Sequence, residues 1–167
     1  MKIAVIGYSG SGKSTVSKRL GEVYGIPLLH LDTVQFCPGW QERNREEARA
    51  IAAEFMQQDD WVIDGNYRGF FQEERLEQAD RILFLNLSRA ACLIRAVRRY
   101  VRYRGTTRED MAAGCQEKMD REFLWWILYK GRTGPIRRRY REIRGRYLDK
   151  TVVLKNQRQI DRYLQTL

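Results

Sequence analysis

The stretch that decides the fold of this chain is Gly7-Tyr8-Ser9-Gly10-Ser11-Gly12-Lys13-Ser14, which is followed by Thr15. It matches the pattern G-x-x-x-x-G-K-S/T at every position, with an apolar run before it and an amphipathic stretch after it. Glycines permit a tight turn that points successive backbone N–H groups at an anion, and the start of a helix adds its positive dipole end. The pattern predicts a loop that binds the phosphates of ATP or GTP. The alternative is a glycine-rich turn that only joins a strand to a helix.

The residue types of this loop each have a chemical task in phosphate binding. Lys13 is expected to reach the β- and γ-phosphates, and the Ser14 hydroxyl is expected to ligate Mg²⁺. We therefore predict ATP and Mg²⁺ as cofactors. The predicted nucleotide-binding residues of the loop are Gly7, Ser9, Gly10, Ser11, Gly12, Lys13, Ser14 and Thr15.

Outward from the loop, short apolar runs alternate with longer amphipathic stretches. The runs are rich in Val, Ile and Leu on both faces, which is typical of strands in a buried parallel sheet. Such alternation predicts an α/β fold with right-handed crossovers. The expected strands are residues 2–6, 27–30, 61–64, 81–85 and 151–154. The expected helices are residues 13–24, 45–58, 88–104, 109–129, 135–147 and 157–167.

Length and composition indicate a single globular domain over residues 1–167. A hydrophobic share of 43% can form one core, and no apolar run approaches the roughly 18 residues that span a bilayer. Three widely spaced cysteines and one histidine argue against a zinc site. We expect a cytoplasmic protein with free thiols, no secretory signal and no membrane partner.

The net charge of +10 is concentrated in one segment. Residues 81–150 hold 19 Lys and Arg against 7 Asp and Glu, a net charge of +12, whereas the remaining residues hold 12 against 14, or −2. Positive charge confined in this way predicts an anionic partner, either nucleic acid or nucleotide phosphates. Charge alone does not decide between them.

One expected strand ends in a carboxylate, Asp64, and another is followed by one, Asp32. Asp64 can hold Mg²⁺ through water, opposite Ser14, although an Asp-Gly turn would give the same pattern. Asp32 is expected in the same crevice, because ligands of parallel α/β sheets bind beyond the carboxyl ends of the strands. It could accept a proton from an acceptor hydroxyl or orient the acceptor, and the alternative is an Asx cap. We interpret His30 as a partly buried strand residue.

Arginines gather in the basic segment. Arg95 and Arg99 lie four residues apart and therefore share one face of the expected helix 88–104, while Arg98 and Arg102 form the neighbouring stripe. Guanidinium groups stabilise the charge that spreads over a transferring phosphate, although most runs of charge are simply solvated faces. A second basic cluster, near the start of the helix 135–147, comprises Arg137, Arg138, Arg139 and Arg141.

Several segments occur along the chain in an order that resembles the P-loop kinases of the adenylate-kinase-related nucleoside and nucleotide kinase group. The segments after the loop that carry this resemblance are Leu31-Asp32, Asp64-Gly65-Asn66-Tyr67-Arg68 and Leu93-Ile94-Arg95-Ala96-Val97-Arg98-Arg99. The whole chain is more closely similar to bacterial proteins labelled "DNA topology modulation protein". That similarity is carried by His30-Leu31-Asp32-Thr33-Val34-Gln35-Phe36, Pro38-Gly39-Trp40, Asp64-Gly65-Asn66-Tyr67 and Leu154-Lys155-Asn156-Gln157.

The resemblance implies a three-layer P-loop NTPase fold. Its five-stranded parallel sheet would have the order 2-3-1-4-5, with helices on both faces and a helical, arginine-rich lid insertion at about residues 105–148. On the nucleotide side, Arg95 would lie against the base, Arg99 near the transferring phosphate, and the loop around Asn156 and Gln157 at the adenine. The residues that we expect to act in catalysis are Lys13, Asp32, Arg95 and Arg99.

On the acceptor side, the resemblance gives Arg68 a role in binding an acceptor phosphate. The expected acceptor-binding residues are Asp32, Trp40, Asp64 and Arg68, and the expected metal-binding residues are Ser14 and Asp64. The chain departs from nucleotide-monophosphate kinases between Asp32 and Trp61, where the acceptor-binding insert is short and its arginines match no known pattern.

Three functions compete on this sequence. The favoured one is an enzyme that moves the γ-phosphate of ATP to a small acceptor, such as a nucleoside, a nucleotide or another metabolite. The alternative is an ATP-binding regulatory protein that affects DNA topology or transcription through its basic insertion, and the third is an ATP-binding switch. The sequence contains no helix-turn-helix or zinc finger, so nucleic acid is not the favoured partner.

Overall fold

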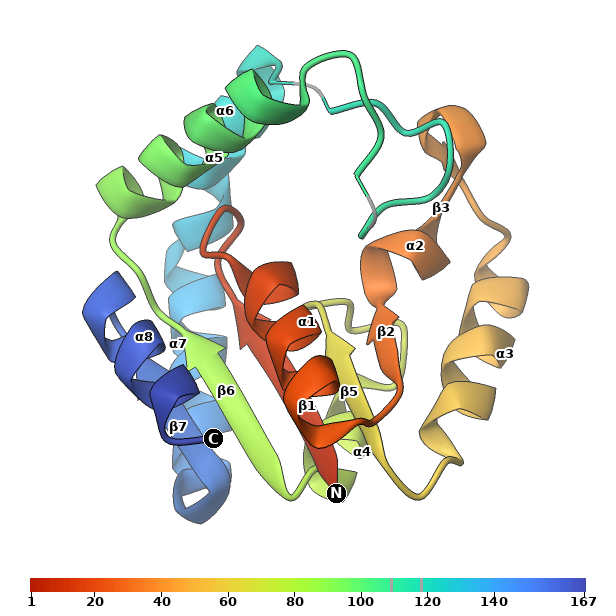
Figure 1. The fold of residues 1–167 in the computed structure, drawn as a ribbon, viewed down its shortest axis with the longest axis vertical. Helices are drawn as coiled ribbons and strands as arrows, with labels where there is room; N and C mark the ends of the chain where they lie inside the picture. Colours follow the sequence, from red (N-terminus) through yellow and green to blue (C-terminus); the bar gives the residue numbers. More distant parts are fainter. Residues whose placement is uncertain (109, 118) are drawn as a thin grey trace.

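Five parallel strands form the centre of the fold (Figure 1). The structure, a computed structural model, describes residues 1–108, 110–117 and 119–167. The strands are β1 (Lys2–Gly7), β2 (Leu28–His30), β5 (Trp61–Asp64), β6 (Arg81–Leu85) and β7 (Thr151–Leu154). Their order in the sheet is β2-β5-β1-β6-β7, which is 2-3-1-4-5 when the five strands are counted along the chain. Both the positions of the strands and their order confirm the predictions.

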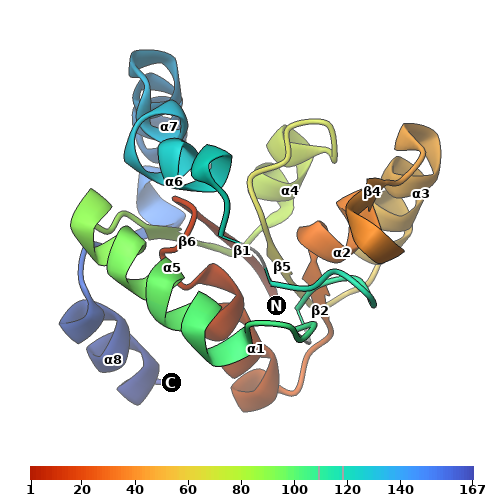
Figure 2. The same ribbon diagram turned by 90° about the horizontal axis from the view of Figure 1, so that it is seen from above.

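Helices cover both faces of this sheet (Figure 2). One face carries α1 (Lys13–Tyr24) and α8 (Gln157–Gln165), and the other carries α4 (Gln72–Gln78) and α7 (Gly134–Arg146). The remaining α-helices are α2 (Leu31–Gln35), α3 (Arg45–Met56), α5 (Arg89–Tyr103) and α6 (Arg121–Leu128). Three 3₁₀ turns, η1 (Pro38–Trp40), η2 (Lys130–Arg132) and η3 (Leu148–Lys150), and a hairpin of β3 (Phe36–Cys37) and β4 (Gln41–Glu42) complete the fold.

The apolar runs are strands because both of their faces are buried. Every residue of β5 is buried, and so are all residues of β1 except the first. On one face, α7 packs Tyr140 against Phe84 of β6 with the ring centroids 4.6 Å apart. Helix α7 is therefore part of the layer on that face of the sheet. Among the described residues, no helix is both long enough and apolar enough to cross a membrane.

The expected helix 109–129 is wrong over most of its length. Only α6 is helical there, and it begins where the Asp120 side chain accepts a hydrogen bond from the Phe123 N–H. Between α5 and α6, Gly105 and Gly114 have φ angles of 75° and 76°, which interrupt helical geometry. Residues 110–117 instead form turns and isolated bridges, and the expected start of the helix at 109 lies outside the described residues. The short helices α2 and α4 were not predicted.

Candidate functional site

The loop of residues 7–14, which we call the phosphate loop after its sequence motif, joins β1 to α1. Its backbone has the conformation that the motif requires. Gly10 and Gly12 have φ angles of 76° and 92°, in the left-handed region. A Cβ atom at Gly12 would lie 2.3 Å from Arg95 Nη1, and one at Gly10 would lie 2.5 Å from the Cys92 carbonyl oxygen. Both positions favour glycine because their backbone is left-handed. A side chain at Gly10 would also press on the α5 backbone, and one at Gly12 would displace the guanidinium of Arg95. None of the described side chains caps the start of α1, so its first N–H groups can meet an anion.

Side chains from other elements hold this loop in place. Asn66 accepts a hydrogen bond from the Gly7 N–H at 3.1 Å and donates one to the Gly7 carbonyl at 2.6 Å. Arg95 Nη1 donates to the Ser11 carbonyl at 2.6 Å, and Lys13 Nζ donates to the Tyr8 carbonyl at 3.3 Å. The Ser11 hydroxyl is buried and has no hydrogen-bond partner among the described residues. Such an orphaned donor beside a fixed backbone suits a bound oxyanion.

Beneath the loop lies Arg132, which the sequence analysis did not single out. Its guanidinium carbon lies 3.7 Å from the centroid of the Tyr8 ring. Its Nη2 donates to the Leu87 carbonyl at 2.8 Å and lies 3.1 Å from Cys92 Sγ. Arg132 therefore fixes the position of the loop relative to the start of α5. No local pattern distinguishes it from the other arginines of the basic segment.

Asp64 lies at the carboxyl end of β5, next to β1 and β2. In the parallel register it pairs with Val5 on one side and with His30 on the other. The Asp64 side chain is buried, and its Oδ2 lies 3.1 Å from His30 Nδ1. Burial alone would lower the pKa of His30, but the hydrogen bond to Asp64 and the negative charges of Asp64, Asp110 and Asp32 together outweigh it and raise the pKa. His30, interpreted above as a strand residue only, is thus in direct contact with a candidate site residue.

Asp32 lies in the first turn of α2 and does not cap that helix, because no capping hydrogen bond from a described side chain is present there. Its Oδ1 accepts a hydrogen bond of 2.6 Å from the Tyr67 hydroxyl. Burial, followed by the charge of Asp32, raises the pKa of Tyr67, so its hydroxyl stays a neutral donor. The buried Arg75 donates to the carbonyls of Tyr67 and Phe70 and so fixes the turn that presents Tyr67.

The residues expected to hold Mg²⁺ fit a magnesium ion. The Ser14 hydroxyl makes no hydrogen bond within the described part of the chain, and Asp64 uses only Oδ2 for His30. A free hydroxyl and a free carboxylate oxygen are hard oxygen ligands. Mg²⁺ is usually bound by only one or two such protein ligands, and phosphate oxygens and water complete its coordination.

The expected arginines divide into two groups. Arg95 contacts the loop, and Arg99 Nε donates to Glu117 Oε1 at 2.8 Å. Arg98 and Arg102 are exposed, as the solvated-face alternative requires. Of the second cluster, Arg137, Arg138 and Arg141 are exposed and Arg139 is half-buried.

On the acceptor side, the exposed Arg68 approaches Arg139. Burial, together with the charge of Arg68, lowers the pKa of the Arg139 guanidinium. Trp40 Nε1 donates to the Gln116 carbonyl at 3.0 Å, so Trp40 contacts the segment that follows α5.

Asn156, Gln157 and Thr15 lie at the surface in this structure. The Asn156 side chain caps α8 by accepting a hydrogen bond from the Gln159 N–H at 2.9 Å. Gln157 donates to Asp161 within the same helix. None of these contacts involves the phosphate loop, so an adenine-binding role for Asn156 and Gln157 stays a prediction.

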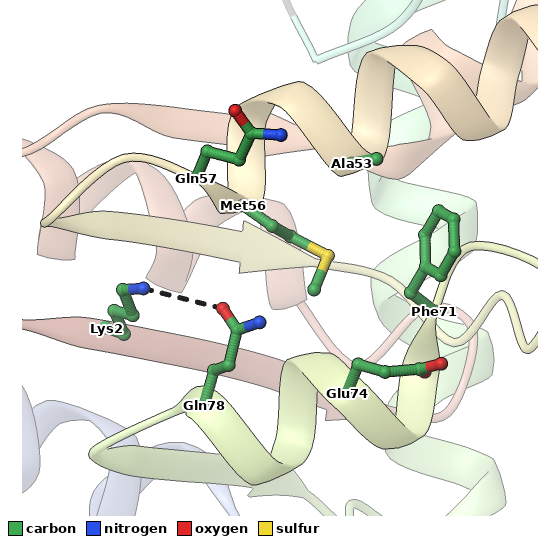
Figure 3. A pocket seen from close by; sticks show the side chains of 7 residues that line it. All are labelled: Lys2, Ala53, Met56, Gln57, Phe71, Glu74 and Gln78. Atoms are coloured by element: carbon green, nitrogen blue, oxygen red, sulfur yellow. Dashed lines mark hydrogen bonds between the residues drawn. The ribbon is translucent and has the colours of Figure 1, made fainter.

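A pocket of about 430 Å³ lies away from this site, between α3 and α4 (Figure 3). Lys2, at the opposite end of β1 from the phosphate loop, donates there to Gln78 Oε1 at 3.4 Å. The lining residues are Lys2, Ala53, Met56, Gln57, Phe71, Glu74 and Gln78. None of them is an expected site residue.

Solved structures share the fold of this chain at low sequence identity. The shikimate kinase from Acinetobacter baumannii, in complex with shikimate, has a TM-score of 0.59 and 19% identity over 99% of this chain and 89% of its own. The chain has the fold of shikimate kinase. The protein TT1252 from Thermus thermophilus has a TM-score of 0.57 and 17% identity, covering 99% and 95% of the two chains. The shikimate kinase from Bacteroides thetaiotaomicron has a TM-score of 0.51 and 19% identity, with the same coverage.

No protein-family model and no curated protein matches the sequence. The similarity to proteins labelled "DNA topology modulation protein" therefore stays a prediction.

Proposed function

We propose that this chain is a kinase that transfers the γ-phosphate of ATP to a hydroxyl group of a small acceptor. The observation that supports this best is that Asp32, held by Tyr67, and Asp64 lie at the edge of the sheet where the phosphate loop begins. A protein that only binds ATP has no need of a fixed carboxylate beside the phosphate loop. In a kinase, such a carboxylate meets the hydroxyl that attacks the phosphate.

The loop and the arginines would bind and orient the nucleotide. Backbone N–H groups of residues 10–14 would hold the phosphates, and Lys13 would exchange its contact with the Tyr8 carbonyl for phosphate oxygens. Arg95 already fixes the loop through the Ser11 carbonyl, and Arg99 lies one turn further along the same face of α5. Both guanidinium groups would lower the energy of negative charge on the transferring phosphate.

On the acceptor side, Asp32 would orient the hydroxyl and accept its proton. Ser14 and Asp64 would hold Mg²⁺, which supplies charge neutralisation at the phosphates when it is bound. Arg68 would bind an anionic group of the acceptor if the acceptor carries one.

An ATP-consumption screen across nucleosides, nucleoside monophosphates and small hydroxylated metabolites tests this proposal. We expect at least one acceptor to be phosphorylated, and we expect Asp32→Asn to lower kcat by about 10²-fold. Asp59→Asn, which changes an exposed aspartate, is the matched control and should leave kcat unchanged. ATP binding without phosphorylation of any acceptor would favour the ATP-binding switch instead.

A further inference from the structure

The chain between α5 and α6 crosses over to the β3–β4 hairpin (Figure 1). We call residues 104–108 and 110–117 the lid segment. Its Cys115 Sγ lies 3.3 Å from the Cys37 carbonyl oxygen and 3.4 Å from the Trp40 backbone nitrogen. The neighbouring Gly114 lies against Pro38. The lid segment is therefore docked on the hairpin, and this docking buries Cys115.

One carboxylate ties the lid segment to α5. The Glu117 side chain is only 3% exposed, and its Oε1 accepts the hydrogen bond from Arg99 Nε. Its Oε2 lies 2.7 Å from Arg108 Nε, an ionic contact in which the N–H is not aligned for a hydrogen bond. Arg108 also pairs with Asp110 at 2.7 Å. Without Glu117, two guanidinium groups would face each other in a half-buried space with no charge between them.

The way in which Glu117 contacts Arg99 leaves the other end of that guanidinium group available. A guanidinium group can bind a carboxylate or phosphate through its Nε side or through its paired Nη1 and Nη2. Arg99 uses Nε for Glu117, and its Nη atoms make no hydrogen bond to any residue that the structure describes. The Arg99 guanidinium carbon lies over the ring of Phe123, 5.6 Å from its centroid, which is a cation–π contact.

We propose that Glu117 is a positioning residue that holds the lid segment closed and fixes Arg99 with its Nη1 and Nη2 ready for an oxyanion. The inference rests on the proposed function only in naming that oxyanion as a phosphate of the nucleotide. The same carboxylate contacts Arg99 of α5 and Arg108 of the lid segment. When the lid segment opens, Arg99 therefore loses the contact that orients it.

The burial of Cys115 gives a readout of lid closure that needs no activity. In a Cys37→Ser background, iodoacetamide labels Cys115 only when the lid segment opens, and mass spectrometry measures the rate. Cys37 contacts Cys115 through its backbone oxygen, so Cys37→Ser keeps that contact. Cys92 is a fully buried residue of α5, and burial raises the pKa of its thiol, so labelling of Cys92 would report global unfolding instead.

We expect Glu117→Gln and Glu117→Ala to raise the labelling rate of Cys115 about tenfold or more, because each breaks a buried ion pair. Glu122→Gln, which changes an exposed glutamate five residues away, should stay within about twofold of the parent protein. Arg99→Ala should raise the rate as Glu117→Gln does, and the double variant should add nothing further. Unchanged labelling of Cys115, or additive effects of the two changes, would overturn the proposal.

The kinetic readout separates positioning from packing. With ATP as the varied substrate, Glu117→Gln should lower kcat about tenfold and change KM less than about threefold. Faster labelling of Cys115 with an unchanged kcat would overturn the role in positioning Arg99. If the parent protein does not bind ATP at all, the proposed function fails, and the labelling rates of the single and double variants still decide whether Glu117 and Arg99 act together.

Discussion

The Tyr67 hydroxyl and the Asp32 carboxylate, 35 residues apart in the chain, are joined by a hydrogen bond of 2.6 Å. Tyr67 follows β5 and Asp32 lies in the first turn of α2, so the bond connects α2 to the segment that follows β5. In the proposed kinase, Asp32 would need one fixed orientation to meet the acceptor hydroxyl, and the buried, neutral phenol of Tyr67 would give it one.

Replacing Tyr67 by Phe should therefore weaken both the fold and the site. The free energy of unfolding should fall by about 1 kcal/mol, because one part-buried hydrogen bond to a charged group is lost while the ring stays packed. Urea unfolding measures this change. Tyr129→Phe is the matched control, since Tyr129 is 54% exposed. Equal stability of the two variants would mean that the Tyr67–Asp32 bond contributes nothing measurable.

Lys13→Ala should abolish ATP binding and leave the fold intact. Among the described residues, the Lys13 side chain hydrogen-bonds only to the Tyr8 carbonyl of its own loop, and Lys13 is not part of the hydrophobic core, so its removal should disturb no core packing. Titration calorimetry with ATP and Mg²⁺, beside circular dichroism, checks both halves of the prediction. Arg19→Ala, on the exposed side of the same helix, should bind ATP as the parent protein does. An unchanged affinity in Lys13→Ala would refute the phosphate-loop assignment.

Arg95→Ala should lower kcat by about 10²-fold in an active assay, with a smaller change in KM for ATP. Arg95 holds the Ser11 carbonyl and lies against Gly12, so it fixes the loop as well as supplying charge. Arg98→Ala is the control, because Arg98 is exposed on the neighbouring stripe of α5. Equal kcat values for the two variants would mean that Arg95 contributes nothing to the reaction beyond what the exposed Arg98 contributes.

Binding of DNA should be weak, nonspecific and steeply dependent on salt. A net charge of +12 over residues 81–150 attracts any polyanion at low ionic strength. Fluorescence anisotropy with two unrelated duplexes should therefore show no sequence preference, loss of binding as salt rises, and release by ATP and Mg²⁺. Tight binding of one duplex at about 150 mM salt, unaffected by ATP, would put the regulatory alternative first.

Local patterns were enough to predict the strands and the phosphate loop. A strand of a buried parallel sheet is apolar on both faces, so its position can be read from the sequence, as for Trp61–Asp64. Likewise, Gly10 and Gly12 are glycines because the backbone there is left-handed. The expected helix 109–129 failed because helical periodicity was extended across Gly114 and past Asp120, whose side chain begins a new helix.

The contacts that build the candidate site depend on tertiary structure. Because β5 lies between β2 and β1, residues at its carboxyl end and just after it reach both neighbours: Asp64 contacts His30, and Asn66 contacts Gly7. Arg132 and Glu117 likewise gain their roles from the Leu87 carbonyl and Arg99, 45 and 18 residues away. Spacing along the chain carries no signal for such pairs. Because backbone sterics and burial act locally, the amino-acid sequence was enough to predict which segments are strands and where the loop after β1 needs glycine. Which side chains meet at that loop was decided only by the order of the strands and the packing of the helices on them.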